Sequence, residues 1–483
     1  MTATTTAPTG LFLAGRWTAG GAGTLTTFNP STGEPMEDVA SASAEDVDTA
    51  VAAATKALRG DWAAVPPSQK GNLLTRLADL VERDAETLAR LEALEIGVPF
   101  GFASGLFVPN LIGSLRYYAG WADKVNGEQV VNDGYFGAPT HAYTRREPVG
   151  VIAAIVPWNA PLMILGWKLA PALATGNTVI VKPAEDASLS ILHLAKLVEE
   201  AGFPAGTVQV LPGVGGVVGE ALAVHPGVHK VSFTGSTETG RRILRNSAGN
   251  FKRTTLELGG KSPQILFEDA DLDAAIRGAA MGIFANQGQV CAAGTRIFVH
   301  RSIHDAVLDG LKAAAEAQVV GDPFEATTTM GPLVNRAQRD KVLGYVEKGK
   351  AEGAKLVTGG TTPDGPGFFV NPAVFAGTND QVIAREEIFG PVGTVIPFDD
   401  DAEAVALAND NDYGLAATVW TTDLSRAHTV SAALQAGAVG VNGWSPLGPQ
   451  LPWGGVKASG IGRELGYEGI LANTEAKTVT IVL

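Results

Sequence analysis

From residue 149 onward, the chain alternates short apolar runs with segments of helical spacing, and this alternation constrains the fold more than any other feature. Val149–Val156 is almost wholly apolar, which is typical of a strand buried on both faces of a parallel sheet. Repeated strand–helix–strand units predict an α/β fold with a doubly wound parallel sheet, in which ligands bind at the carboxyl ends of the strands. Further strands are expected at 177–182, 208–211, 228–233 and 254–258, and helices at 161–175, 188–201, 219–224 and 236–248.

A second α/β block is predicted between about residues 260 and 455. Its expected helices are 271–285, 303–317, 336–352 and 402–409, and its expected strands are 295–300, 392–397 and 415–421. Ahead of the first block, Leu11–Trp17 is predicted to be a strand, and Ser43 to be the N-cap of a helix that ends near Leu58. Ser68–Ile96 has helical spacing throughout and is predicted to be one packing helix.

Two segments belong to neither block. Gly127–Pro148 is predicted to form a hairpin, and the β-branched run Thr478–Leu483 is predicted to be a strand. Because a terminal apolar strand needs a pairing partner, we expect that partner in a second subunit, with pairing inside its own chain as the alternative.

The charge balance excludes some classes of partner. The 483 residues carry 36 Lys and Arg against 50 Asp and Glu, a formal charge of −14. Nucleic acids and anionic membranes attract basic patches, so neither is an expected partner. The longest apolar stretch is far shorter than the ~20 residues of a membrane span, and the opening MTATTTAPTG resembles a frayed tail more than a signal peptide.

The chain has one cysteine, Cys291. A single cysteine forms no internal disulfide and no cysteine-cluster metal site, so the cytoplasm is the expected compartment. No metal is expected elsewhere, because the pairs His225/His229 and His300/His304 do not each lie on one helix and lack an acidic third ligand.

Polar and glycine-rich motifs follow the predicted strands. FTGSTETG (233–240) joins a strand to a helix whose N-terminus can hold a phosphate, although such turns also occur without a ligand. KPAE (182–185) places a lysine and a carboxylate at a strand end. They can bind ribose hydroxyls and disfavour a 2′-phosphate, or form a solvated ion pair. LPGVGGVVG (211–219) lacks the third glycine of a dinucleotide fingerprint and is interpreted mainly as a tight turn.

Three further residues carry candidate chemistry. Cys291 follows a polar, glycine-rich loop, which favours an accessible nucleophile over an inert core residue. Glu257 ends an apolar strand and is either a general base or an ion-pair partner of Lys261. Asn159 follows a strand end, where its amide can stabilise an oxyanion or cap a helix.

Seven motifs occur in a fixed order along the chain: PWNAP (157–161), KPAE (182–185), FTGSTETG (233–240), ELGGKS (257–262), NQGQVCAAG (286–294), EEIFGPV (386–392) and PWGGVKASGIGRELG (452–466). From about Leu11 to its end, the chain resembles the NAD(P)-dependent aldehyde dehydrogenase family. The resemblance implies a Rossmann-like NAD-binding domain (1–126 and 149–258), an α/β catalytic domain (259–455) and a β oligomerisation arm (127–148 and 470–483). It also implies a homodimer or homotetramer.

The resemblance assigns chemistry to individual residues. It implies that Cys291 attacks an aldehyde, and that the resulting oxyanion is held by the Asn159 side chain and the Cys291 backbone N–H. Water activated by Glu257 then releases a carboxylic acid, and Lys168 and Glu464 match positions linked to proton relay. The cofactor is expected to be NAD rather than NADP, bound by Trp158, Lys182, Glu185, Gly215, Phe233, Gly235, Ser236, Glu387 and Phe389.

The expected substrate is a bulky apolar aldehyde: aromatic, terpenoid or of medium chain length. Ala160 and Ala285 occupy positions where family members often have an aromatic residue, while Trp167, Leu447 and Trp453 remain as apolar walls. Two other activities stay open, transfer of the acyl group to CoA and a cysteine-nucleophile esterase. Loss of catalysis, as in crystallin-like relatives, is disfavoured by the intact Cys291, Glu257 and Asn159. Retention of Glu257 favours hydrolysis.

Overall fold

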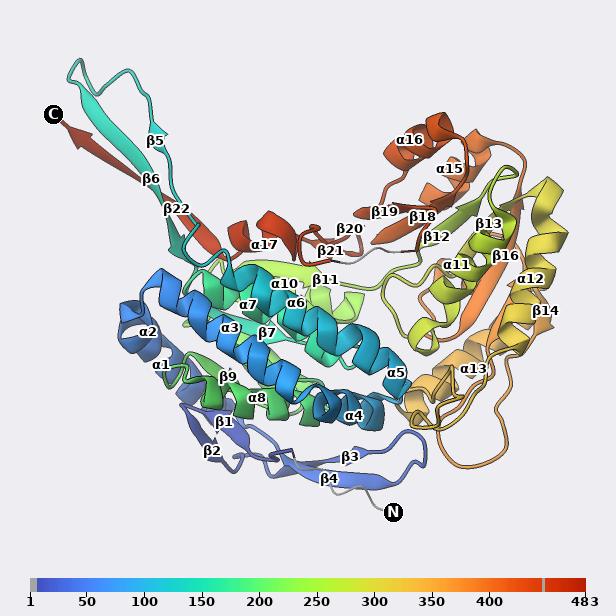
Figure 1. The fold of residues 1–483 in the computed structure, drawn as a ribbon, viewed down its shortest axis with the longest axis horizontal. Helices are drawn as coiled ribbons and strands as arrows, with labels where there is room; N and C mark the ends of the chain where they lie inside the picture. The colour runs from blue at the N-terminus through green and yellow to red at the C-terminus, as the bar shows by residue number, and fades with distance from the viewer. Residues whose placement is uncertain (1–6, 445–447) are drawn as a thin grey trace.

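Two mainly parallel sheets and one protruding arm make up the protein (Figure 1). The computed structural model describes residues 7–444 and 448–483. The mixed α/β architecture expected from the sequence is confirmed.

The first sheet has eight strands in the order β2-β1-β9-β8-β7-β10-β11-β21. Its five central strands, from β9 to β11, run parallel. Their register aligns Lys182 with Ile155, and Ile155 with Phe233, so these strands end at one common edge. The strands are β1 (Leu11–Leu13), β2 (Arg16–Thr18), β7 (Val151–Ile155), β8 (Thr178–Lys182), β9 (Val208–Val210), β10 (Lys230–Thr234), β11 (Arg253–Glu257) and β21 (Gly460–Ile461).

Helices cover both faces of this sheet. They are α1 (Ala44–Arg59), α2 (Asp61–Ala64), α3 (Pro67–Arg83), α4 (Ala85–Ile96), α5 (Phe100–Phe102), α6 (Val108–Ala119), α7 (Pro161–Ala174), α8 (Leu189–Ala201), α9 (Glu220–Val224) and α10 (Thr237–Ser247). Ile152 and Ala154 of β7 belong to one apolar cluster with α3, α6, α7 and α8, whereas Val151 and Ala153 belong to another with α1 and α9. Every residue of β7 is therefore buried, which explains its unbroken apolar sequence.

The second sheet has seven strands in the order β14-β15-β16-β13-β12-β18-β19. They are β12 (Pro263–Leu266), β13 (Arg296–His300), β14 (Lys355–Thr358), β15 (Ala373–Ala376), β16 (Val392–Phe398), β18 (Ala416–Trp420) and β19 (Ala438–Val441). Its helices are α11 (Leu272–Phe284), α12 (His304–Glu316), α13 (Arg336–Ala351), α14 (Val382–Arg385), α15 (Asp401–Asn409) and α16 (Leu424–Ala433). Two small strand pairs lie outside both large sheets: β3 (Thr24–Phe28) with β4 (Pro35–Ala40) near the N-terminus, and β17 (Tyr413–Gly414) with β20 (Val456–Lys457).

The arm is a three-stranded sheet in the order β22-β6-β5 that projects from the body beside α17 (Gly466–Leu471) (Figure 1). It consists of β5 (Gln129–Val130), β6 (Thr140–Pro148) and β22 (Thr474–Val482). One edge of the terminal strand takes the alternative pairing within its own chain, because β22 pairs with β6 from Thr474↔Pro148 to Val482↔Thr140. Its outer edge has no strand partner within the described residues.

Two local predictions also need correction. The segment 68–96 forms two helices, because Asp84 leaves the helical conformation (φ −97°, ψ 15°) and its carboxylate contacts Arg83 and His193. The segment 11–17 is a hairpin that turns at Ala14 and Gly15, both with positive φ. The predicted N-cap at Ser43 is confirmed, and it forms a reciprocal capping box with Asp46.

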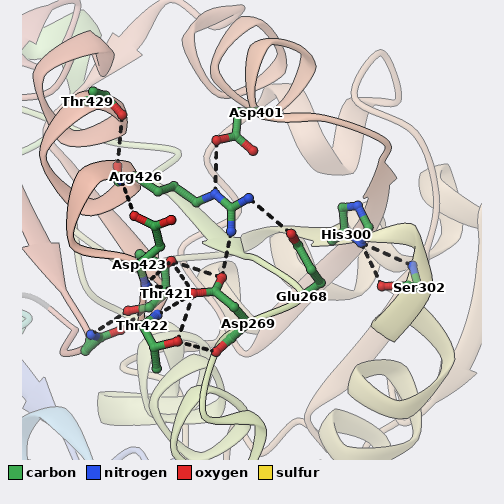
Figure 2. A network of polar contacts seen from close by, with 11 residues as sticks. Glu268, Asp269, His300, Ser302, Asp401, Thr421, Thr422, Asp423, Arg426 and Thr429 are labelled. Atoms are coloured by element: carbon green, nitrogen blue, oxygen red, sulfur yellow. Dashed lines mark hydrogen bonds and ion pairs between the residues drawn. The ribbon is translucent and has the colours of Figure 1, made fainter.

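A polar network ties the elements at one end of the second sheet together (Figure 2). Asp269 accepts hydrogen bonds from the Thr421 hydroxyl and from the backbone N–H groups of Thr422 and Asp423. Arg426 binds Glu268, Asp269 and Asp401. Burial raises the pKa of the Asp269 carboxyl, but these hydrogen bonds outweigh it and hold the pKa well below its usual range.

We expect Asp269→Asn to lower the free energy of unfolding at pH 7 by about 1–3 kcal/mol, the cost of losing charge-assisted hydrogen bonds. A carboxyl whose pKa is lowered by folding stabilises the protein above its unfolded pKa, and this contribution disappears as the pH falls. The deficit of the variant, measured by urea denaturation, should therefore shrink between pH 7 and pH 3. An equal deficit at both pH values would contradict this electrostatic account, and the exposed Asp305→Asn serves as control.

Candidate active site

One cavity of about 190 Å³ lies where the strand ends of the first sheet meet the second block. Seven of the residues singled out in the sequence line it together: Trp158, Asn159, Gly235, Ser236, Cys291, Glu387 and Phe389. Its other lining residues are Pro157, Thr234, Leu258, Gly259, Gln338 and Lys341. Loops after β7, β10 and β11 therefore converge on the only cysteine of the chain.

The surroundings of Cys291 disfavour the charged thiolate form of its side chain. Burial raises its pKa to about 12, and the charges of Glu387 and Glu257 act in the same direction. Both carboxylates therefore lie within electrostatic range of the sulfur. The preceding loop holds Asn286 and Gln287 at positive φ (49° and 56°), a conformation that side-chain hydrogen bonds maintain.

Asn159 is tied to the cysteine loop in both directions. Its Nδ2 donates to the backbone oxygen of Gln289 at 2.8 Å, and Asn286 Nδ2 donates to the backbone oxygen of Asn159 at 2.8 Å. The N-cap of α7 is Ala160, so Asn159 does not act as the helix cap that the sequence left open. An amide nitrogen carries two N–H donors, and the second one of Asn159 is available to a ligand in the cavity.

Glu257 ends β11 and is only 3% exposed. Neither of its carboxylate oxygens has a hydrogen-bond partner among the described residues. Burial, followed by the charge of Glu464, raises its pKa well above the usual range, while Lys168 and Arg463 oppose that rise. The alternative ion pair with Lys261 is not formed, since the Lys261 ammonium is also without a hydrogen-bond partner.

Lys168 and Glu464 form a buried ion pair. Lys168 Nζ lies 2.6 Å from Glu464 Oε1, and the Ser232 hydroxyl donates to the same oxygen at 2.8 Å. These side chains do not line the cavity. Glu464 acts on Glu257, which does not line the cavity either but raises the pKa of the Cys291 thiol through its charge.

Lys182, Glu185 and Gly215 form a second cluster at the end of β8. Lys182 Nζ lies 3.1 Å from Glu185 Oε2, and the Gly215 N–H donates to Glu185 Oε1 at 2.6 Å. Burial raises the Glu185 pKa, but Lys182 and this N–H outweigh it and lower the pKa overall. The carboxylate is 43% exposed and thus keeps acceptor capacity for hydroxyl groups, which fits the ribose of a nucleotide.

The remaining predicted residues that the structure describes do not line the cavity. Phe233 is buried and supports the turn at Gly235, where an added Cβ would lie 2.5 Å from its ring, so it does not line the cavity. Trp167 and Trp453 pack with ring centroids 6.1 Å apart, and Ala160 is buried. Leu447 lies outside the described residues.

Ala285 lines a separate groove of about 820 Å³. The apolar side chains around it are Phe100, Phe102, Met281, Phe284 and Phe324. Only the strained turn Asn286–Gln287 and three further residues separate Ala285 from Cys291 along the chain.

Gln338 and Lys341 of α13 were missed in the sequence. They lie on an amphipathic helix in which a Gln and a Lys give no chemical signal. Gln338 Nε2 donates to the backbone oxygen of Phe389 at 2.6 Å, which helps hold that residue at its positive φ of 60°.

Known proteins resemble this chain in sequence and in fold. The profile of the aldehyde dehydrogenase family matches residues 17–479. The human mitochondrial aldehyde dehydrogenase is 50% identical over 95% of this chain and 89% of its own, and chicken retinal dehydrogenase 2 is 48% identical over 94% and 88%. The solved structure of a Bacillus cereus aldehyde dehydrogenase in complex with NAD⁺ superposes with a TM-score of 0.97 at 44% identity, covering 100% of this chain and 98% of that one.

The chain belongs to the aldehyde dehydrogenase family. The expected family, the enzyme class of NAD-dependent aldehyde dehydrogenases and the cofactor NAD are confirmed. No helix within residues 7–444 and 448–483 has the length and apolar character needed to cross a bilayer.

The raised thiol pKa gives a direct test of the cysteine environment. Below its pKa of about 12, the thiolate fraction of Cys291 increases about tenfold per pH unit. In protein free of cofactor, the rate of alkylation by iodoacetamide should therefore rise steadily between pH 7 and pH 10 without a plateau. Because Cys291 is the sole cysteine, mass spectrometry of the intact chain reports the reaction at one site. A plateau near pH 8 would contradict the half-buried, carboxylate-flanked setting of this thiol.

Proposed function

We propose that the chain oxidises bulky apolar aldehydes to carboxylic acids through a thioester on Cys291. The observation that supports this most is the single cavity lined by Cys291, Asn159, Ser236 and Glu387, with Glu257 buried nearby. Nucleophile, amide donor and carboxylates are thereby arranged around one point.

The residues around the cavity fit NAD. Lys182, Glu185 and Gly215 would hold the adenosine ribose, and Ser236 at the N-terminus of α10 would meet the pyrophosphate. Glu387, Phe389 and Trp158 would position the nicotinamide end, with the Trp158 and Phe389 rings already in edge-to-face contact at 5.3 Å. The Glu185 carboxylate favours NAD over NADP because it repels a 2′-phosphate. Bound NAD supplies the acceptor for a hydride.

The first step forms a bond between Cys291 Sγ and the aldehyde carbon. Because the thiol pKa is high, its proton must leave as the bond forms, and Glu257 has two free carboxylate oxygens to take it. The carbonyl oxygen becomes an oxyanion that the Asn159 amide and the Cys291 backbone N–H stabilise. Loss of hydride from that carbon restores the C=O bond and leaves a thioester.

Hydrolysis completes the reaction. Glu257 takes a proton from a water molecule whose oxygen attacks the thioester, and the C–S bond then breaks to release the acid and the thiolate. Lys168, Glu464 and Ser232 are hydrogen-bonded to one another, and a water molecule between Glu464 and Glu257 would connect this cluster to the Glu257 carboxylate, which has no direct partner among the described residues. The unpaired Glu257 carboxylate supports water over CoA as the acceptor of the acyl group.

A bulky apolar substrate is supported by the small side chains beside the site. None of these residues lines the Cys291 cavity itself: Ala160 follows Asn159 in the chain, Trp167 and Trp453 pack against each other, and Ala285 lines the neighbouring aromatic groove, which would take a long or branched chain.

We also propose the three-part domain division given above, a homodimer or homotetramer joined through the arm, and a cytoplasmic location. The separate sheets support the division, the open outer edge of β22 supports assembly, and the single cysteine supports a reducing compartment.

Glu257→Gln should release about one NADH per active site in a rapid burst and then stall, because the amide cannot activate water for hydrolysis of the thioester. Stopped-flow absorbance at the NADH band, with intact mass of the acyl-enzyme, measures both. Steady turnover at the wild-type rate would remove Glu257 from the role of base. Cys291→Ala should show no burst while retaining NAD binding.

Aromatic and C6–C10 aldehydes should have a higher kcat/KM than succinic semialdehyde in a steady-state panel run with NAD. Ala285→Phe should lower kcat/KM for the larger aldehydes by about tenfold and spare acetaldehyde, since a new ring would fill space used only by large substrates. A preference for succinic semialdehyde, or an equal loss on all substrates, would contradict the proposed substrate class.

A further inference from the structure

The C-terminal turn of α4 carries two glutamates with no access to solvent, Glu92 and Glu95. Neither forms an ion pair with a Lys or Arg among the described residues. Each carboxyl group instead accepts hydrogen bonds from the first turn of a helix elsewhere in the chain. Since buried polar groups are costly unless they bond to a partner, this arrangement points to a role beyond filling the core.

Glu92 caps α7. Its Oε1 accepts a hydrogen bond from the Leu162 N–H at 3.0 Å. Helix α7 has no cap of its own, because its N-cap is Ala160 and its first residue is Pro161, which has no N–H. This helix begins directly after Asn159, so Glu92 fixes the point at which the loop of the amide donor ends.

Glu95 caps α8. Its two carboxylate oxygens accept hydrogen bonds from the Leu189 and Ser190 N–H groups at 2.6 and 3.0 Å. The N-cap residue, Ser188, directs its hydroxyl to the Ala184 backbone oxygen and provides no cap. Helix α8 follows the loop that contains Lys182 and Glu185, so Glu95 fixes that loop at its far end.

A third contact reaches the cysteine loop. Gln287 Nε2 donates to the backbone oxygen of Gly97, the residue that ends α4, at 3.0 Å. Gln287 is one of the two residues held at positive φ before Cys291. One helical end therefore contacts the three loops that carry Asn159, Lys182–Glu185 and Cys291.

We propose that Glu92, Glu95 and the Gly97 carbonyl, here called the α4 anchor, are positioning groups that set these three loops relative to one another. The proposal rests on the proposed function for the roles of Asn159, Glu185 and Cys291. The anchor touches neither cofactor nor substrate: it acts through the loops, and each of its groups acts on a different one.

Charge is not required for this role. Burial raises the pKa of Glu92 to about 8 and that of Glu95 to about 7, so both carboxyls hold a proton for part of the neutral range and still accept through the carbonyl oxygen. Glutamine keeps one acceptor oxygen, which suffices for the single hydrogen bond of Glu92 but supplies only one of the two acceptors of Glu95. Methionine has a similar length but no strong acceptor. A Gln and Met pair at each position thus separates hydrogen bonding from packing.

The experiment measures three readouts on the full-length protein: kcat at saturating NAD, the NAD dissociation constant from tryptophan fluorescence, and the alkylation rate of Cys291. Glu92→Met should lower kcat by about tenfold with an NAD dissociation constant within about twofold of wild type. Glu95→Met should do the reverse, weakening NAD binding about tenfold. Gln287→Met should raise the alkylation rate at least about threefold and leave NAD binding unchanged.

Glu92→Gln should restore values close to wild type, and Glu95→Gln should recover only part of the NAD affinity because it keeps one of the two acceptors. Glu86→Met, on the exposed side of the same helix where Glu86 pairs with Arg90, is the matched control and should change none of the readouts. Hydrogen exchange adds a direct measure. Glu92→Met should increase amide exchange in 160–166 but not in 187–193, and Glu95→Met should give the opposite pattern.

Uniform loss across all readouts, failure of Glu92→Gln to restore kcat, or an NAD affinity of Glu95→Gln no better than that of Glu95→Met would overturn the proposal in favour of simple packing. Should Glu92→Met not fold, Glu95→Met and Gln287→Met decide the question, because each acts on a separate loop. Absence of aldehyde oxidation in the wild-type protein would reject the proposed function alone, since NAD binding, alkylation and hydrogen exchange still test the anchor.

Discussion

Burial of the central strands on both faces is the constraint on which the rest of the structure depends. β7 has no residue facing water, and its neighbours β8 and β10 are equally enclosed. Parallel pairing brings the ends of these strands to one edge, where polar side chains can meet a ligand. The amide donor, Glu257 and the cysteine loop gather at that edge, while the polar residues inside a strand, such as Ser232 of β10, bond only within the protein.

The same burial sets the electrostatics of the site. Glu257 lies at the last position of a strand, near Glu464 and without a hydrogen-bond partner, so its carboxyl group holds a proton more readily than a surface glutamate does. The thiol is likewise kept in its neutral form. A neutral thiol avoids placing a further anion beside the Glu257 and Glu387 carboxyl groups, and its proton leaves only as the sulfur bonds to a substrate carbon.

Much of this could be predicted from the sequence, because apolar runs and cap residues are local signals. The strand that leads to Asn159, the helix start at Ser43 and the chain's membership in the family all carry such signals. The break at Asp84 does not, since both helices bury the same side and the spacing continues across it. Gln338 and Lys341 were missed because their importance comes only from tertiary contact. The pairing of the terminal strand with β6 could not be chosen over a partner in a second subunit, because β-branched composition predicts pairing but does not identify the neighbour.

Gly454 lies far from Glu257 in the sequence, yet the space around the Glu257 carboxylate depends on this glycine having no side chain. A methyl group at this position would stand 2.7 Å from Glu257 Oε1, and the φ of 153° already disfavours any side chain. The room that the Glu257 carboxylate has for rotation is thus maintained by a missing side chain on a loop near the other end of the sequence. Any redesign of the apolar wall around Trp453 must leave this neighbouring glycine untouched, even though glycine itself has no functional group to conserve.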